Sequence, residues 1–224
     1  MAGQSKRLQF IVESGVEVSA VFMRPADARW LLVLAHGAGA GMSHPFLEKL
    51  ANELTTVGIA TFRYQFPYME QRRRVPDSPA LLTATVARAV ETAAEAAPGL
   101  PLLAGGKSMG GRMTSQASAQ QLLSGIRGVV FFGFPLHPPG RPGTQRADHL
   151  TKVEAPMLFL QGTRDEFADL TLLRPICQKL GSLATLHVID SADHSFHVPK
   201  KSGKSDSEVL RELVETVVGW ADKL

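Results

Sequence analysis

The chain has 224 residues, of which 44% are hydrophobic and 20% charged, an ordinary composition for a globular protein with one substantial core. The formal net charge of +3 is small, so we expect no nucleic-acid partner, which would need a concentrated basic face. Cys177 is the only cysteine, which excludes an internal disulfide and a cysteine-based metal cluster, and we expect it to be a small buried hydrophobe. Neither a signal-peptide core nor a membrane-spanning run is present, so a cytoplasmic protein without a membrane partner is expected.

The N-terminal segment predicts an antiparallel hairpin. Residues 8–12 and 16–23 alternate between polar and apolar side chains, with a tight turn at 13–15. The continuous apolar run 30–35 is typical of a strand buried on both faces of a parallel sheet. It leads into a glycine-rich loop at 36–41.

Helices and strands alternate from this point to the end of the chain. We predict loops at 66–79, which carries the solvated basic run Arg72 to Arg74, and at 136–152. The alternation predicts an α/β fold: a mostly parallel sheet with helices on both faces and the N-terminal hairpin at one edge. No linker or repeat interrupts it, so residues 1–224 are expected to form a single domain. The predicted helices are 45–57, 80–97, 113–123, 170–180 and 205–224, the last with a capping box at Ser205 and Glu208, and the predicted strands are 59–64, 100–104, 126–134, 155–161 and 184–189.

The pattern G-x-S-x-G spans residues 106–110, between the predicted strand 100–104 and a helix. Strand, sharp turn and helix are the context in which this pattern forms a nucleophile elbow. The turn would hold Ser108 in a strained backbone conformation, and a side chain at Gly106 or Gly110 would collide with the neighbouring strand or helix. The first helical N–H groups beside the serine favour negative charge there.

Ser108, Asp165 and His194 each follow a predicted strand, in the chain order of the triad of α/β hydrolases. A serine hydroxyl is a weak nucleophile that needs a base within hydrogen-bond reach. Imidazole suits this task because its unperturbed pKa lies near ~6.5, and a carboxylate behind it fixes its tautomer. We therefore assign Ser108 as the nucleophile, His194 as general base and then acid, and Asp165 as the orienting acid.

Two neighbours compete for these roles. Asp190 is an alternative acid, although it is too close to His194 in sequence to orient it easily, and His197 is an alternative base further from the strand end. Asp165 could also serve only as a cap for the helix that follows it.

Other polar side chains near the strand ends have simpler interpretations. We expect His36 to support its loop through hydrogen bonds, and His137 and His149 to be surface histidines. No spacing of His, Asp or Glu suggests a metal, and no cofactor is expected. Four basic residues near strand ends could attract an anionic substrate, but pairing with carboxylates is favoured for them: Arg63, Lys107, Arg112 and Arg164.

Taken together, these motifs resemble the small lidless α/β hydrolases of the dienelactone-hydrolase-like type. The resemblance rests on His36-Gly37, on the elbow at 106–110, and on the segments 162–165 (GTRD) and 193–196 (DHSF), and it extends over nearly the whole chain. The most similar group comprises bacterial predicted hydrolases related to the hydrolase-like domain of a chromatin acetyltransferase-complex subunit. The resemblance implies an α/β-hydrolase fold, and the absence of a long insertion between strands predicts that there is no cap domain. Dienelactone hydrolases use cysteine where this chain has Ser108, so their substrate is not implied.

Two backbone N–H groups should form an oxyanion hole, one from Met109 and one from Ala38, with Gly39 as the alternative to Ala38. We expect a serine hydrolase that cleaves a small ester, thioester or small amide through an acyl-enzyme on Ser108. The alternatives are a catalytically inactive binding or scaffold protein on a hydrolase fold, and an acyltransferase or perhydrolase using the same three residues. Substrate, acyl size and oligomeric state stay open, as does whether the loop 136–152 closes over the site.

Overall fold

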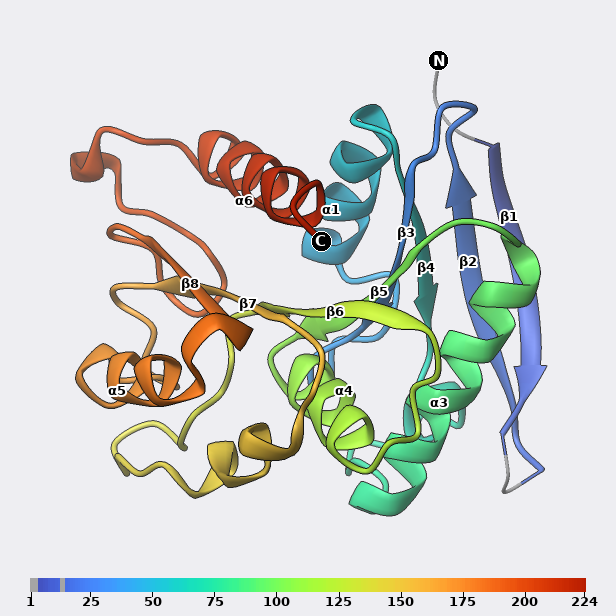
Figure 1. Cartoon of the computed structure of the whole chain (residues 1–224), viewed down its shortest axis with the longest axis horizontal. Helices are drawn as coiled ribbons and strands as arrows, with labels where there is room; N and C mark the ends of the chain where they lie inside the picture. Colours follow the sequence, from blue (N-terminus) through green and yellow to red (C-terminus); the bar gives the residue numbers. More distant parts are fainter. Residues whose placement is uncertain (1–3, 13–14) are drawn as a thin grey trace.

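The computed structural model describes residues 4–12 and 15–224, so residues 13 and 14 of the predicted turn lie outside the described residues. Its centre is an eight-stranded sheet with the order β1-β2-β4-β3-β5-β6-β7-β8 (Figure 1). Strands β3 to β8 run parallel, whereas β2 is antiparallel to both its neighbours. The predicted sheet with its N-terminal antiparallel hairpin is therefore confirmed. The strands are β1 (Gln4–Ile11), β2 (Glu17–Arg24), β3 (Trp30–Ala35), β4 (Ile59–Tyr64), β5 (Leu102–Lys107), β6 (Ile126–Phe132), β7 (Met157–Gly162) and β8 (Ala184–Ile189).

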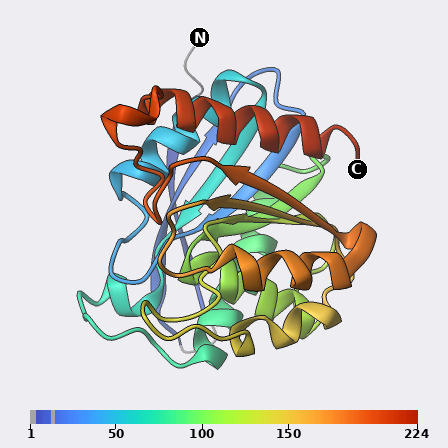
Figure 2. The same ribbon diagram turned by 90° about the vertical axis from the view of Figure 1, so that its left-hand side faces the viewer.

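Helices cover both faces of the sheet (Figures 1 and 2). Helices α1 (Pro45–Thr56) and α6 (Asp206–Ala221) pack against each other on one face, and α3 (Pro79–Ala96), α4 (Met109–Ala119) and α5 (Leu170–Leu180) cover the other. Successive residues of β6 alternate between the two cores, as the pleat of a strand requires. Val130 and Phe132 pack in the core under α6, and Val129 and Phe131 in the core under α5.

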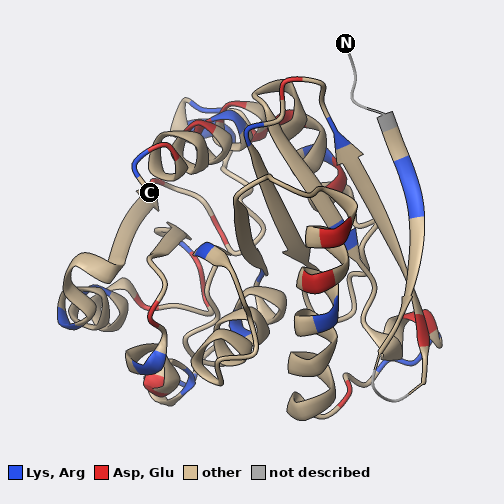
Figure 3. Cartoon of the chain, turned by 45° about the vertical axis from the view of Figure 1, so that its right-hand side comes forward, with Lys and Arg blue, Asp and Glu red and all other residues tan. Residues whose placement is uncertain are grey.

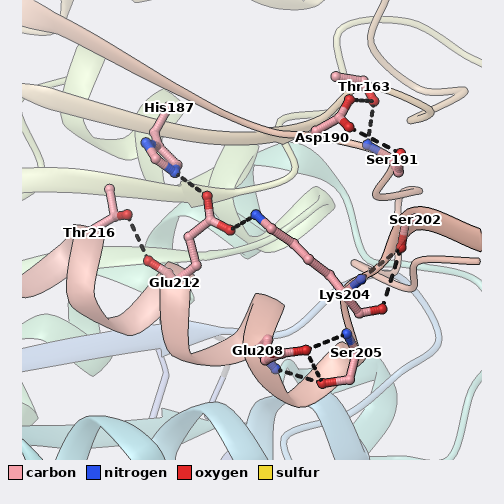
Figure 4. Close-up of polar contacts among 10 residues, drawn as sticks. All are labelled: Thr163, His187, Asp190, Ser191, Ser202, Lys204, Ser205, Glu208, Glu212 and Thr216. Carbon is pink, nitrogen blue, oxygen red and sulfur yellow. Dashed lines mark hydrogen bonds and ion pairs between the residues drawn. The ribbon is translucent and has the colours of Figure 1, made fainter. Parts of the chain in front are cut away.

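The N-terminus of α6 has the predicted capping box (Figure 4). The Ser205 hydroxyl accepts the backbone N–H of Glu208, and the Glu208 carboxylate accepts the backbone N–H of Ser205. One turn further along, the Glu212 carboxylate accepts a hydrogen bond from Lys204 and lies 2.9 Å from the Nε2 atom of His187 on β8. These contacts tie α6 to the edge strand of the sheet.

Charged residues of both signs lie on the outer helices. Figure 3 shows basic and acidic positions next to each other on α3, where Arg88 and Glu91 form an ion pair. The run from Arg72 to Arg74 is exposed, as expected for a solvated loop. In the described ranges, no helix combines the length and the apolar composition needed to cross a bilayer.

The largest differences between the structure and the sequence-based prediction lie in three segments. Helix α4 begins at Met109 instead of residue 113. Glycine is a poor helix former, but the atoms around Gly110 and Gly111 leave no room for a Cβ atom, so glycine is accommodated in the first turn of this helix. The predicted loop 66–79 contains a short helix, α2 (Pro67–Glu70). The predicted loop 136–152 ends in a 3₁₀ helix, η1 (Gln145–Lys152), with its two apolar residues, Ala147 and Leu150, buried.

Candidate active site

Ser108 occupies a sharp turn between β5 and α4. Its backbone angles, φ 52° and ψ −119°, are unusual for a residue with a side chain and indicate strain, as expected for an elbow. A Cβ atom on Gly106 would lie 2.4 Å from the carbonyl oxygen of Ala35, and one on Gly110 would lie 2.5 Å from the same oxygen. The expected collision is therefore real, because the turn packs directly against the end of β3.

His194 lies between Ser108 and Asp165. Its Nε2 atom is 2.9 Å from Ser108 Oγ, and its Nδ1 atom is 2.8 and 2.9 Å from the two carboxylate oxygens of Asp165. An ionised carboxylate only accepts hydrogen bonds, so Nδ1 carries the proton and Nε2 is free to accept from the serine hydroxyl. The three side chains selected from the sequence are thus brought together from the ends of β5, β7 and β8.

Asp165 is held by further donors besides His194. It is 6% exposed and accepts the backbone N–H of Phe167 at 2.8 Å and a hydrogen bond from the side-chain amide of Gln161. The other end of that amide accepts the N–H of Phe134 at 2.9 Å. Gln161 was not among the residues selected from the sequence, because its two contacts together depend on β6 and β7 lying side by side.

The two competing residues point elsewhere. Asp190 accepts a hydrogen bond from the hydroxyl of Thr163 and contacts Ser191 (Figure 4). His197 lies 2.9 Å from the Asp206 carboxylate at the surface, with 61% of its side chain exposed. Neither contacts Ser108.

The glycine-rich loop after β3 lies against the elbow. A Cβ atom on Gly37 would lie 3.7 Å from the Cβ atom of Ser108. The backbone N–H of Gly39 donates to the hydroxyl of Tyr68 at 3.0 Å. One of the two candidate amides of this loop is therefore already paired within the protein.

His36 supports this loop, as expected. It is fully buried, its Nδ1 atom lies 2.7 Å from the carbonyl of Gly37, and its Nε2 atom accepts the N–H of Phe66 at 3.1 Å. Burial lowers the pKa of His36 to about 4, so the ring is neutral at physiological pH. Its role is to connect the loop after β3 with the loop after β4.

A pocket of about 300 Å³ lies beside Ser108 and His194. The Phe167 ring forms part of its wall and lies 4.3 Å from the imidazole of His194, centre to centre. Among the described residues, none from 136–152 lines this pocket, since that segment packs against the core next to β6 and β7. The other apolar lining residues are Ala38, Ala40, Phe46 and Leu47.

The expectation that the four basic residues pair with carboxylates holds only for Arg63 among the described residues. Arg63 lies 3.7 Å from Glu48, whereas Arg164 donates to the backbone carbonyl of Ser191. Arg112 lies near Arg146, and burial together with this second positive charge lowers the pKa of Arg112. Lys107 also has no ion pair among the described residues.

The expectation that His137 and His149 are surface histidines was wrong. His137 is 5% exposed and accepts the N–H of Asp169 at 2.9 Å. His149 lies 2.8 Å from the hydroxyl of Ser115, and burial lowers its pKa to about 4. Both side chains therefore stabilise the packing of residues 136–152 against the rest of the protein. Cys177 is buried as expected, which raises the pKa of its thiol to about 11.

Within residues 4–12 and 15–224, no group of three or more His, Cys, Asp or Glu side chains is arranged as metal ligands.

The family model described as "Alpha/beta hydrolase domain" matches residues 28–222. A dienelactone hydrolase from Anabaena variabilis is 20% identical, with 96% of this chain and 97% of that chain covered and a TM-score of 0.75. A lidless α/β serine hydrolase from Xanthomonas campestris is 19% identical, with 97% and 95% covered and a TM-score of 0.75. An esterase domain from a Rhodothermus marinus protein is 18% identical, with 98% of both chains covered and a TM-score of 0.73.

Proposed function

The chain belongs to the α/β-hydrolase family and is a small hydrolase of the dienelactone-hydrolase-like type, and on this basis we propose that it cleaves a small ester or thioester through an acyl-enzyme on Ser108. The observation that carries the proposal is the unbroken hydrogen-bond chain from Asp165 through His194 to Ser108, beside a pocket. A binding or scaffold protein would have no need of this arrangement.

The mechanism follows from the tautomer of His194. The Ser108 oxygen attacks the acyl carbon while His194 Nε2 takes the hydroxyl proton, and the Asp165 carboxylate stabilises the imidazolium that forms. The imidazolium then protonates the leaving alcohol or thiol, which departs and leaves an ester on Ser108. Water attacks this ester, again giving its proton to Nε2, and the acid is released as the proton returns to Ser108.

We assign the oxyanion hole to the backbone N–H groups of Met109 and Ala38. Met109 is the first residue of α4, where N–H groups have no partner within the helix. Ala38 lines the pocket, whereas the N–H of Gly39 is engaged by Tyr68, which favours Ala38 as the second donor. Both donors would act on the carbonyl oxygen as negative charge develops there.

The pocket favours a short acyl group. Its volume of about 300 Å³ is at the lower end for ligand sites, and its wall is mostly apolar. Activated acetyl and butyryl esters should therefore be hydrolysed faster than octanoyl esters, measured as kcat/KM on a p-nitrophenyl ester series. A marked preference for octanoyl esters would contradict this size limit.

The decisive experiment is labelling with a fluorophosphonate probe. The wild type should be labelled rapidly, and both Ser108→Ala and His194→Ala should lose labelling while keeping the wild-type circular dichroism spectrum. Asp165→Asn should label roughly 10³- to 10⁴-fold more slowly, because the wrong tautomer of the imidazole is stabilised. Asp190→Asn, the matched control, should label at the wild-type rate.

Absence of labelling in a well-folded wild type would refute the proposal and favour the scaffold alternative. Formation of an acyl product on an added alcohol or peroxide, in preference to the free acid, would instead indicate a transferase or perhydrolase. Product analysis of the same ester reaction separates these outcomes.

A further inference from the structure

Lys107, the last residue of β5, carries a buried ammonium group that forms no hydrogen bond with the described residues. Part of the residue lines the pocket, but its Nζ atom is out of contact with solvent and has no hydrogen-bond partner in the part of the chain that the structure describes. Burying a charge without a partner costs free energy. Within residues 4–12 and 15–224, no ion pair offsets this cost, so a role in function would explain why the charge is buried.

The surroundings of Nζ supply that explanation. A Cβ atom placed on Gly133 would lie 3.1 Å from Lys107 Nζ and 3.4 Å from both Asp165 Oδ2 and His194 Nδ1. Three polar atoms, from the end of β5 and from the loops after β7 and β8, therefore converge on a space that is open only because residue 133 has no side chain. The Phe196 ring lies near the ammonium, with 5.5 Å between Nζ and the ring centre.

Three titratable groups face the ammonium: the carboxylates of Asp165 and Asp193 and the imidazole of His194. A nearby cation favours the ionised form of a carboxylate and disfavours a second cation on an imidazole. These effects are stronger in the protein interior than in water, because the effective dielectric constant is lower.

We propose that Lys107 is a positioning residue of the active site, whose ammonium attracts the carboxylate of Asp165 and opposes a second positive charge on His194. The inference rests on the proposed function, since it assigns Lys107 a role through the proposed base.

The charge state of Lys107 agrees with this role. Burial lowers the pKa of Lys107 to about 8, and the carboxylates of Asp165 and Asp193 act in the opposite direction. The side chain is therefore charged in most molecules at neutral pH.

The test compares Lys107→Met and Lys107→Gln with the wild type, and uses Lys179→Met as control because Lys179 is an exposed lysine in the last turn of α5. The rate of fluorophosphonate labelling is measured from pH 4.5 to 9. In both Lys107 variants the midpoint of the acid limb should move to higher pH by about one unit, and it should stay in place in the control. Both variants should be at least as resistant to denaturant as the wild type, since an unpaired buried charge has been removed.

An unchanged midpoint in folded variants would overturn the proposal. So would loss of labelling accompanied by loss of stability, because this would indicate a structural role alone. The titration midpoint of the His194 imidazole, followed by NMR in a Ser108→Ala background with and without Lys107→Met, needs no activity. The two proposals can therefore fail separately. If Lys107→Met shifts this midpoint although the wild type is not labelled by the probe, the serine-hydrolase function is refuted while the electrostatic effect of Lys107 is established.

Discussion

Gln161 and Asp165 form a buried side-chain pair in which the glutamine amide donates to the carboxylate while its oxygen accepts the backbone N–H of Phe134. Gln161 is 0% exposed and belongs to β7, and Phe134 follows β6. One amide therefore holds the proposed acid in place relative to two strand ends. Partners of this kind orient functional side chains, and their loss typically costs roughly 10- to 100-fold in activity at metal sites.

Replacing Gln161 by methionine, which has a similar shape, should lower kcat about 10-fold with a smaller effect on KM, because the carboxylate loses a donor that orients it. The variant also leaves the N–H of Phe134 without a partner, so the free energy of unfolding should fall by about 1–3 kcal/mol. Both quantities are measured on a short-acyl ester and by urea denaturation, with exposed Gln178→Met as control. A stability loss with unchanged kcat would limit Gln161 to a structural role.

A Cβ atom at Gly133 should crowd the proposed catalytic side chains. It has φ +73°, and a Cβ atom would lie 3.1–3.4 Å from Lys107, Asp165 and His194. Gly140 is a matched control because it has φ +68° and open space around it. Alanine at either position should lower the free energy of unfolding by about 1–2 kcal/mol through backbone strain. Only Gly133→Ala should also slow labelling, by at least about 10-fold, and equal labelling rates in the two variants would contradict the crowding at residue 133.

Tyr68 and Tyr64 offer a second matched pair. The Tyr68 hydroxyl accepts the N–H of Gly39, whereas the Tyr64 hydroxyl is fully buried and has no partner in the described ranges. Tyr68→Phe should loosen the loop that carries Ala38 and lower kcat about 10-fold, since the oxyanion donor is displaced. Tyr64→Phe should leave kcat unchanged and raise the free energy of unfolding by up to about 1 kcal/mol. The reverse ranking of the two variants in kcat would refute this assignment.

Stability should fall on the acid side because two histidines, fully buried His36 and partly buried His149, are neutral in the folded protein. Their pKa values, about 4 for both His36 and His149, lie below the unfolded value of 6.5. Between pH 6.5 and 4 the unfolded chain binds more protons than the folded one, so the free energy of unfolding decreases as the pH falls. Fully buried His36 alone can contribute roughly 3 kcal/mol. The check is urea denaturation across this range together with NMR titration of the imidazoles, and midpoints near 6.5 would contradict it.

The strands and most of the helices could be predicted from the sequence. Apolar runs bounded by glycine or polar residues predicted β3, β4 and β8 with their observed ends. Helical spacing of apolar residues predicted both ends of α5. The start of α4 was missed because helix propensity disfavours glycine, whereas here only glycine fits against the neighbouring backbone. The division into one domain and the cytoplasmic location stay predictions.

The three proposed catalytic residues could be selected because their order and their places after strands are visible in the chain. Their supporting residues could not be selected in the same way. Gln161, Gly133 and Lys107 acquire their surroundings only when β5, β6 and β7 lie side by side, and no local pattern reports that approach. Lys107 was expected to pair with a carboxylate, because pairing is the common outcome for a lysine near acidic residues.

The position of β8 at the edge of the sheet has a consequence for heat inactivation. Among the described strands, β8 pairs only with β7, and most of its residues are half-buried, yet the loop that follows it carries His194. Fraying of one edge strand would separate the proposed base from Ser108 while the central strands stay paired. On gradual heating, probe reactivity should therefore disappear several degrees before the circular dichroism signal, and it would return on cooling as long as the core had never opened.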